Sequence, residues 1–300
     1  MGRGRGGCYV PPVPVWPKLS LPKLFIMVTL MVAVGSPPPV RAAAPEAAPA
    51  AGSFRIGLIG DTGYSPGDEA NLLQTRSSTN AAGLAFVVHD GDIWKGGTPC
   101  SDDRLRRVKA VFNGFTTLVY TPGDNEWQDC PNPEGRLPAI RRVFFGRAES
   151  LGTRQIPQLR QPGVPENARW ERGGVVFATL DVPGPGGGGP ATTADLAWLD
   201  SSFDEAARVK AAAVMVIWQD DPTDGSSPTL VARLRRRAAA FGRPVVLVHG
   251  DTHQYKLDHP WPDTPNLTRL ETFPGFTPQW VRATVNPATA QVFSFATMQH

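Results

Sequence analysis

The chain has 300 residues, 41% of them hydrophobic, which is enough for one large domain or two small ones with a substantial core. Its formal net charge is +3, but residues 1–42 hold five of the 30 basic residues and none of the 27 acidic ones. Residues 43–300 therefore carry 25 basic and 27 acidic residues, a formal charge of −2 that gives no indication of nucleic-acid binding.

The first 42 residues have the composition of a secretory leader. Basic residues precede an apolar run at 24–35, and small residues follow at 42–44. The run is too short to span a bilayer as a helix. We predict a signal peptide at 1–42, a flexible Pro- and Ala-rich tether at 43–52 and a single domain at 53–300. The protein is then exported to the periplasm or the cell exterior, with no stable membrane span after cleavage. An uncleaved anchor is the alternative.

The cysteines fit an exported protein. Cys8 lies in the predicted leader, which leaves Cys100 and Cys130 as an even pair in the mature chain. Secreted proteins keep disulfides because their compartment is oxidising. We predict a disulfide between these two residues; the alternative is two unrelated buried thiols.

From residue 54 onward, apolar β-like runs alternate with helical stretches, which favours an α/β fold with layers around buried sheets. A surface loop at the rim of the site is expected at 183–190, where Gly and Pro dominate. The strand-rich tail suggests a second sheet packed on the first. Strands are predicted at 55–59, 84–88, 117–120, 174–180, 213–218, 245–248, 267–273, 279–285 and 291–296. Helices are predicted at 68–82, at 102–112 with Ser101 as its cap, at 193–208 with Leu196, Leu199, Phe203 and Ala207 on one face, and at 228–241.

Short carboxylate-bearing segments follow these strands along the chain. Strand ends are where a fold can bring distant side chains together, and clustered carboxylates repel each other by about 4 kcal/mol per pair at ~4 Å and a dielectric of ~20. Acidic groups gathered at one place therefore predict a bound cation. The segments are Gly60-Asp61-Thr62-Gly63-Tyr64, His89-Asp90-Gly91-Asp92, Gly123-Asp124-Asn125-Glu126, Trp218-Gln219-Asp220-Asp221 and His249-Gly250-Asp251-Thr252-His253.

In order and spacing these segments resemble the calcineurin-like metallophosphoesterase superfamily. That family places Asp-x-His, Gly-Asp, Gly-Asn-His-Asp/Glu, a lone His and Gly-His-x-His at successive strand ends. The resemblance implies a four-layer αββα sandwich of two mixed β-sheets flanked by helices. It also implies two divalent metal ions that activate a bridging water, which attacks the phosphorus of phosphomonoesters or phosphodiesters.

The segments also depart from the family pattern. Asp61, Asp92 and His253 match family ligands, whereas several other positions carry a different residue. Gly63 stands where a ligand His is expected, Asp124 replaces the ligand Asn, Asn125 replaces the His that faces the leaving group, Gln219 replaces the lone His, and Asp251 replaces the first His of the last motif.

The resemblance implies a ligand set for each metal. Asp61, Asp92 and His253 would hold the first ion, with water or the phenol of Tyr64 in place of the missing ligand. The second ion would have oxygen donors alone, which favours Mg²⁺, Mn²⁺ or Ca²⁺ over Zn²⁺ or Fe. Its expected ligands are Asp92, Asp124, Asp251 and the carbonyl oxygen of Gln219.

Proton delivery is where the pattern changes most. Asn125 can hydrogen-bond a phosphoryl oxygen but cannot supply a proton to the leaving group. His249 and Glu126 are the candidate donors. We predict an exported metal-dependent phosphoric ester hydrolase that prefers acidic leaving groups. The alternative is a protein that keeps the fold and binds metal, or serves a structural role, without turnover.

Overall fold

The computed structural model of the protein describes residues 52–182 and 193–300. The predicted signal peptide, the tether up to residue 51 and the Gly- and Pro-rich loop at 183–190 lie outside the described residues. No helix in the described part of the chain is both long and apolar enough to cross a membrane.

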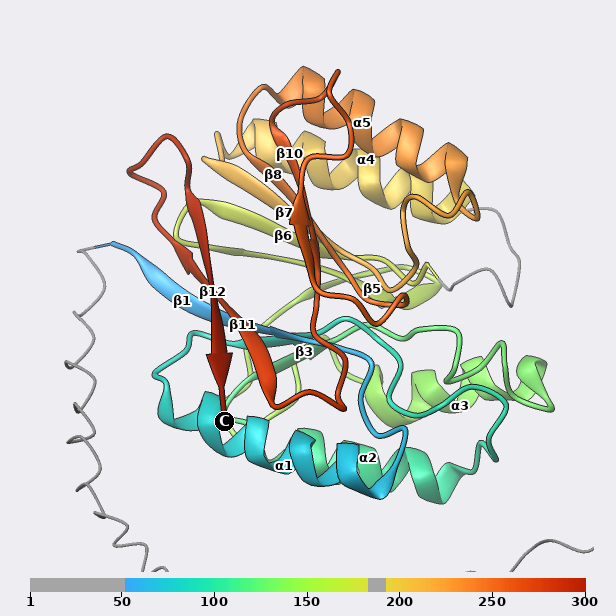
Figure 1. Cartoon of the computed structure of the whole chain (residues 1–300). Helices are drawn as coiled ribbons and strands as arrows, with labels where there is room; N and C mark the ends of the chain where they lie inside the picture. Colours follow the sequence, from blue (N-terminus) through green and yellow to red (C-terminus); the bar gives the residue numbers. More distant parts are fainter. Residues whose placement is uncertain (1–51, 183–192) are drawn as a thin grey trace, which may run out of the picture. The chain divides into compact units, whose positions relative to one another are not determined.

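One sheet has five strands in the order β12-β11-β1-β2-β3. The three strands from the first part of the chain run parallel, and two tail strands extend the sheet: β11 is antiparallel to β1, and β12 is antiparallel to β11. This sheet is therefore assembled from the two ends of the domain, as Figure 1 shows. Its strands are β1 (Phe54–Ile59), β2 (Val87–His89), β3 (Leu118–Tyr120), β11 (Gln279–Val285) and β12 (Phe293–Gln299).

The second sheet has seven strands in the order β4-β5-β6-β7-β8-β10-β9. Its centre, from β6 to β10, is parallel, and antiparallel strands lie at both edges. The strands are β4 (Leu159–Gln161), β5 (Val164–Arg172), β6 (Val175–Thr179), β7 (Ala213–Ile217), β8 (Val245–His249), β9 (Lys256–Asp258) and β10 (Leu267–Glu271).

Three apolar layers hold the sheets and helices together. Alternate residues of each strand point to opposite faces, so Leu58 packs between the two sheets while Ile59 faces the helices. On one side lie α1 (Pro66–Ala81), α2 (Asp102–Phe112) and α3 (Pro133–Phe144), and on the other lie α4 (Thr193–Arg208) and α5 (Pro228–Phe241) (Figure 1). The predicted αββα sandwich of two mixed sheets is confirmed.

Most predicted elements are present, and Ser101 caps α2 by accepting a hydrogen bond from the Arg104 backbone N–H at 3.1 Å. Two expectations are wrong. The tail does not build the second sheet, because β11 and β12 join β1 whereas β9 and β10 join β8. On α4, Ala207 is exposed and Ala206 is buried, because the apolar face is rotated by one residue at the last turn.

The predicted disulfide is present between Cys100 and Cys130, whose Cα atoms are 5.9 Å apart. The bond connects the segment after Asp92 with the segment after Asp124. Two loops that carry predicted metal ligands are therefore covalently joined.

Candidate metal centre and active site

The predicted ligands lie at the carboxyl ends of parallel strands. In the first sheet Ile59 is in register with His89, and His89 with Tyr120, so three acidic segments leave the sheet at the same level. In the second sheet Ile217 is in register with Val248. Such edges are where open α/β sheets bind their ligands.

Hydrogen bonds between the segments draw these loops together. The Asp61 N–H donates to the Gly91 carbonyl at 3.0 Å, and the Gly250 N–H donates to the Gln219 carbonyl at 3.1 Å. The Asp251 N–H donates to the Asp61 carboxylate at 3.2 and 3.3 Å, which links the two sheets. The acidic segments thus form one assembly.

Tyr64 lies at the centre of the predicted first metal site. Its hydroxyl donates to Asp92 Oδ2 at 2.8 Å, accepts from Asn125 Nδ2 at 3.0 Å and lies 3.2 Å from His253 Nε2. It also lies 3.4 Å from Asp61 Oδ1, which is itself 3.6 Å from His253 Nε2. The structure therefore brings together Asp61, Asp92 and His253 around one phenol oxygen.

Asp124 and Asn125 approach Asp92 from the next loop. The Asn125 amide donates to Asp92 Oδ2 at 2.6 Å, and burial together with the charges of Glu126 and Asp124 raises the pKa of Asp92. Gly123 makes this approach possible: a Cβ there would lie 2.0 Å from Asp92 Oδ1 and 2.8 Å from Gln219 Cγ. A side chain at this position would push both neighbours away.

The backbone at the predicted ligands is unusual. Asp61, Asp92, Asp251 and His253 have φ angles of 50°, 59°, 82° and 60°, and they are four of six non-glycine residues with positive φ in the described part of the chain. This left-handed conformation costs of order 1–3 kcal/mol for a side chain of this kind and tends to occur at functional sites. The strain lies at the residues that aim the carboxylates inward.

The carboxylates repel each other in a buried setting. Burial raises the pKa of Asp92 well above its ordinary value, and the charges of Glu126, Asp124 and Asp61 raise it further. Burial also raises the pKa of Asp61, with a smaller contribution from the charge of Asp251. Burial lowers the pKa of His253, the partner of Asp61 at 3.6 Å, and within residues 52–182 and 193–300 no Lys or Arg pairs with Asp61, Asp92 or Asp124.

A divalent cation fits this donor set. Two ligand atoms that bind one cation at ~2.1 Å lie at most ~4.2 Å apart, and the Asp61 Oδ1 to His253 Nε2 distance of 3.6 Å is within that limit. The phenol oxygen of Tyr64 lies at similar distances from both. The uncompensated charge and the donor spacing both suit a metal.

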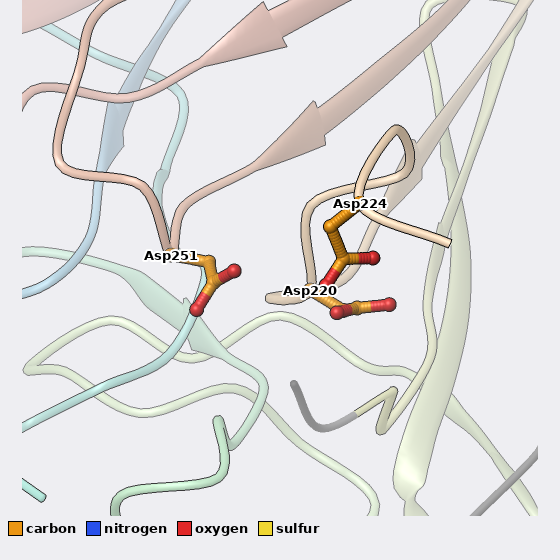
Figure 2. A group of neighbouring side chains, drawn as sticks. All are labelled: Asp220, Asp224 and Asp251. Atoms are coloured by element: carbon orange, nitrogen blue, oxygen red, sulfur yellow. The ribbon is translucent and has the colours of Figure 1, made fainter. Parts of the chain in front are cut away.

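Asp251 and Gln219 lie farther along the same edge. Gln219 Nε2 donates to Asp251 Oδ1 at 3.4 Å, while Gln219 Oε1 is buried without a hydrogen-bond partner among the described residues. The carboxylate of Asp251 gathers with those of Asp220 and Asp224, as Figure 2 shows. Burial and the charge of Asp124 raise the pKa of Asp251 to about 6.

The two candidate proton donors have other partners. The Glu126 carboxylate accepts from the Tyr120 hydroxyl at 2.8 Å and from the backbone N–H groups of Ile93 and Gly123 at 3.1 and 3.2 Å. Burial raises its pKa to about 7. Glu126 thus holds two ligand loops together. No contact of its carboxylate supports the prediction that it delivers a proton, which stays a prediction.

His249 is buried, and its Nδ1 lies 2.8 Å from the Gly250 carbonyl. A carbonyl only accepts, so Nδ1 carries the proton and Nε2 is left as an acceptor, buried and without a partner in the described chain. Burial lowers the pKa of His249 to about 4. Like the role of Glu126, its role as a donor stays a prediction.

Two buried residues outside the predicted set position the loops. His89 accepts from the Gly91 N–H at Nδ1, at 3.3 Å, and its Nε2 donates to the Thr62 hydroxyl at 2.8 Å. Glu271 accepts from the Thr252 hydroxyl at 2.5 Å and pairs with Lys256 Nζ at 2.7 Å. Glu271 carries no motif, and its place at the end of β10 is the one sequence signal that could have indicated it.

Comparisons with known proteins bear on the fold alone. Neither the family models nor the curated protein sequences contain a match to this chain. A dimetal phosphatase from Danio rerio is 12% identical over 82% of this chain and 98% of its own, with a TM-score of 0.54. GAP50, the anchor in the inner membrane complex of Plasmodium, is 9% identical over 82% of this chain and 89% of its own, with a TM-score of 0.53.

The chain has the calcineurin-like metallophosphoesterase fold. This confirms the architecture that the sequence motifs implied. In this fold Asp61, Asp92 and Asp124 follow β1, β2 and β3, and Asp251 follows β8.

Proposed function

We propose that the protein is an exported, metal-dependent hydrolase of phosphoric esters. The observation that carries this proposal is the meeting of Asp61, Asp92 and His253 around the Tyr64 hydroxyl at the carboxyl edge of a metallophosphoesterase fold. Export is supported by the basic and apolar start of the chain and by the disulfide, a bond that persists in oxidising compartments.

Each residue has a proposed role. Asp61, Asp92 and His253 hold a first divalent cation, with Tyr64 supplying a further oxygen. When bound, such cations polarise phosphate oxygens and lower the pKa of water. The second ligand set is the one implied by the family resemblance, with Mg²⁺, Mn²⁺ or Ca²⁺ as the preferred ions. Its members are Asp92, Asp124, Gln219 and Asp251.

The residues of this chain also determine which esters are suitable. Asn125 Nδ2 is placed to donate to a phosphoryl oxygen once it releases Asp92. Glu126 and His249 are engaged with backbone groups, and no contact supports their predicted role as proton donors. We therefore expect aryl phosphates, whose leaving groups need no proton, to be cleaved at least tenfold faster than alkyl phosphates.

The experiment is a hydrolysis assay of the purified protein on p-nitrophenyl and bis-p-nitrophenyl phosphate. It is run with Mg²⁺, Mn²⁺ and Ca²⁺ in turn, against alkyl phosphates of the same type. Asp92→Asn should abolish turnover, whereas Asp103→Asn, which makes the same charge change on an exposed residue of α2, should leave it intact. Equal rates for aryl and alkyl esters would contradict the leaving-group argument.

A metal-binding or structural role without turnover is the second candidate. It is favoured by the closed hydrogen-bond network in which Asp92 is already satisfied by Tyr64 and Asn125. A protein of this kind would be stabilised by divalent cations yet leave both aryl phosphates intact at every metal concentration. Turnover that depends on metal and is lost in Asp92→Asn would instead support the hydrolase.

A further inference from the structure

An exposed aromatic ring lies beside the predicted first metal site. Phe276 is 56% exposed, more than any other large hydrophobic side chain in residues 52–182 and 193–300. Its ring packs edge-on against the imidazole of His253, with centroids 6.1 Å apart and ring planes at 84°. His253 in turn contacts the ring of Tyr64, at 5.1 Å. A chain of ring contacts therefore leads from the proposed metal ligands to an exposed apolar surface.

The loop between β10 and β11 holds this ring in place. The N–H of Gly275 donates to the carbonyl of Asp61 at 2.8 Å, and its carbonyl accepts from Asn71 Nδ2 of α1 at 2.9 Å. A Cβ at Gly275 would lie 2.8 Å from Thr62 Cα and 3.0 Å from the Asp61 carbonyl oxygen, so this close approach requires glycine. The residue before Phe276 is thus fixed on the backbone of a proposed ligand segment.

The same loop carries a second phenylalanine with a different role. Phe273 stacks on Tyr255, with centroids 4.3 Å apart and planes 5° apart, and packs against the apolar layer between the sheets. Thr277 closes the turn by donating from its N–H and its hydroxyl to the Pro274 carbonyl, at 3.0 and 2.9 Å. Among the described residues, Phe276 belongs to none of the three apolar layers. Its ring is therefore not part of the core.

The position of Phe276 distinguishes it from other exposed hydrophobic residues. A single exposed hydrophobic side chain is common on protein surfaces and needs no function. Phe276, however, follows a residue that is anchored on Asp61, and its ring contacts His253, whose own side chain is 36% exposed. Small-molecule sites combine aromatic surfaces with a few placed polar groups. Here the candidate ligands are the polar groups, and Phe276 supplies the aromatic surface next to them.

We propose that Phe276 determines the specificity of the proposed hydrolase by packing against a planar aromatic group of the substrate, in an aryl phosphate or a nucleotide. This inference rests on the proposed function, because the phosphate of such an ester must be held at Asp61, Asp92 and His253. Aromatic rings attract other rings in stacked or edge-to-face arrangements, beyond the apolar area that they bury. Such contacts accept any planar ring, because every ring has a π-face. Phe276 takes no part in bond cleavage.

Phosphonates separate ring binding from the acidity of a leaving group, because they have no ester bond to cleave. The purified full chain is titrated calorimetrically, in MnCl₂, with phenylphosphonate and with cyclohexylphosphonate, whose ring is of similar size but not planar. Phenylphosphonate should bind about fivefold more tightly or better. Phe276→Ala should reduce this preference to less than about twofold, and Phe276→Tyr, which keeps the ring, should retain it.

Leu159→Ala is the matched control and should keep the full preference. Leu159 is 54% exposed, but it lies on β4, at the edge of the seven-stranded sheet that is far from β10. Phe276→Ala should fold, because the ring it removes is exposed and outside the apolar layers. Its melting temperature should stay within about 2 °C of that of the unaltered chain.

Kinetics identify the source of the ring. Phe276→Ala should raise the KM for the preferred ester about fivefold while kcat stays within about twofold, because the residue acts in binding alone. A loss confined to AMP, compared with ribose 5-phosphate, identifies a nucleotide. A loss confined to p-nitrophenyl phosphate identifies an aryl ester.

The possible results separate this inference from the proposed function. A ring preference that depends on Phe276, with no ester cleaved, supports the ring contact and overturns the hydrolase. Metal-dependent cleavage with equal affinities for the two phosphonates in the unaltered chain overturns the ring contact and leaves the hydrolase standing. A preference that survives Phe276→Ala also overturns the ring contact, as does a failure of both phosphonates to bind at millimolar concentration.

Discussion

The hydroxyl of Tyr64 lies 2.8 Å from the Oδ2 atom of Asp92, and this short contact joins the first two acidic loops. The same hydroxyl accepts from Asn125 and faces His253, so its oxygen is shared by three segments of the chain. Tyr64 follows Asp61 by three residues, in place of the histidine that the family pattern places at position 63. We propose that this phenol oxygen takes the place of the missing imidazole as a metal ligand.

Tyr64→Phe tests this substitution of one ligand by another. We expect the cation affinity of the first site to fall by about 10-fold to 100-fold, because a donor oxygen is removed from the ligand set. The fold should survive, since the ring still packs edge-on against His253 at 5.1 Å. Titration with Mn²⁺ measures the affinity. Tyr255→Phe, whose ring stacks on Phe273 at 4.3 Å, is the control. Equal affinities in both variants would show that the phenol is not a ligand.

Asp92→Asn should have opposite effects on stability with and without cation. Burial and three neighbouring acids raise the pKa of Asp92, so without metal its charge destabilises the folded state. The neutral amide should raise the melting temperature in EDTA and remove most of the stabilisation that added Mn²⁺ gives. Differential scanning fluorimetry in both conditions measures this. A lower melting temperature in EDTA would mean that Asp92 is held by contacts stronger than the repulsion.

The contribution of Glu126 to stability without metal should fall as pH rises through neutrality. Burial raises the pKa of Glu126 to about 7 from an ordinary value of 4.5. Between about pH 6.5 and pH 8.5 the folded state therefore loses a proton that the unfolded chain has already lost, which costs about 1 kcal/mol. Buried His89 and His249, with pKa values lowered to about 3 and about 4, act in the opposite direction below and around their ordinary value of 6.5. Their gain offsets the loss from Glu126 between these pH values, so the contribution of Glu126 is measured by comparison with a variant that lacks its carboxyl group.

Urea unfolding in EDTA at the two pH values measures this fall. Between the two pH values the stability of Glu126→Gln should rise by about 1 kcal/mol relative to that of the unaltered chain, because the loss from Glu126 is removed. The variant should also be less stable by about 1–3 kcal/mol, because its amide N–H₂ would face the Gly123 N–H in place of an acceptor. Asp103→Asn should keep the full dependence. If Glu126→Gln shows the same pH dependence as the unaltered chain, then Glu126 is ionised throughout.

Reduction of the Cys100–Cys130 disulfide should destabilise both the fold and the site. Closing a loop of 30 residues stabilises by about 3–4 kcal/mol in the chain-entropy model. The bond also joins the loops that follow Asp92 and Asp124, so cation affinity should fall together with stability. The double variant Cys100→Ala with Cys130→Ala, compared with the oxidised protein by urea unfolding and Mn²⁺ titration, measures both. Loss of stability with unchanged cation affinity would show that the disulfide stabilises the fold without positioning the ligand loops.

The sequence predicts the helices and strands in which the hydrophobic pattern and the capping or turn residues indicate the same structure. The sequence predicts α2 with Ser101 as its cap, and it predicts α5; in the structure two acids lie in the first turn of α2, and Pro228 begins α5. Helix α3 was missed: Gly135 and Pro138 lie inside it, and both disfavour helices when tertiary packing is unknown. The hairpin of β4 and β5 was missed because its strands mix charged and apolar residues.

The sequence predicts that the acidic segments meet, because each follows a strand end. It does not predict which of their side chains contact one another. Asp61, Asp92 and His253 meet as the family motifs imply. A carboxylate oxygen of Asp251 also lies within 4.8 Å of one from Asp220 and one from Asp224, and Asp224 carries no motif. Side-chain direction depends on loop backbone, here a φ of 82° at Asp251, and no sequence pattern specifies it.

Gly123→Ala should damage the site more than the fold. A Cβ at Gly123 would lie 2.0 Å from Asp92 Oδ1, 2.9 Å from the Asp92 backbone nitrogen and 2.8 Å from Gln219 Cγ, so the two loops must separate. We expect cation affinity to fall at least tenfold and the free energy of unfolding to fall by about 1–3 kcal/mol, as for other overpacked positions. The matched control is Gly67→Ala in the first turn of α1, where a Cβ would meet Ser65 Oγ at an ordinary 3.5 Å. Mn²⁺ titration and urea unfolding of both variants measure the difference, and equal behaviour would mean that the loop after β3 moves freely relative to Asp92.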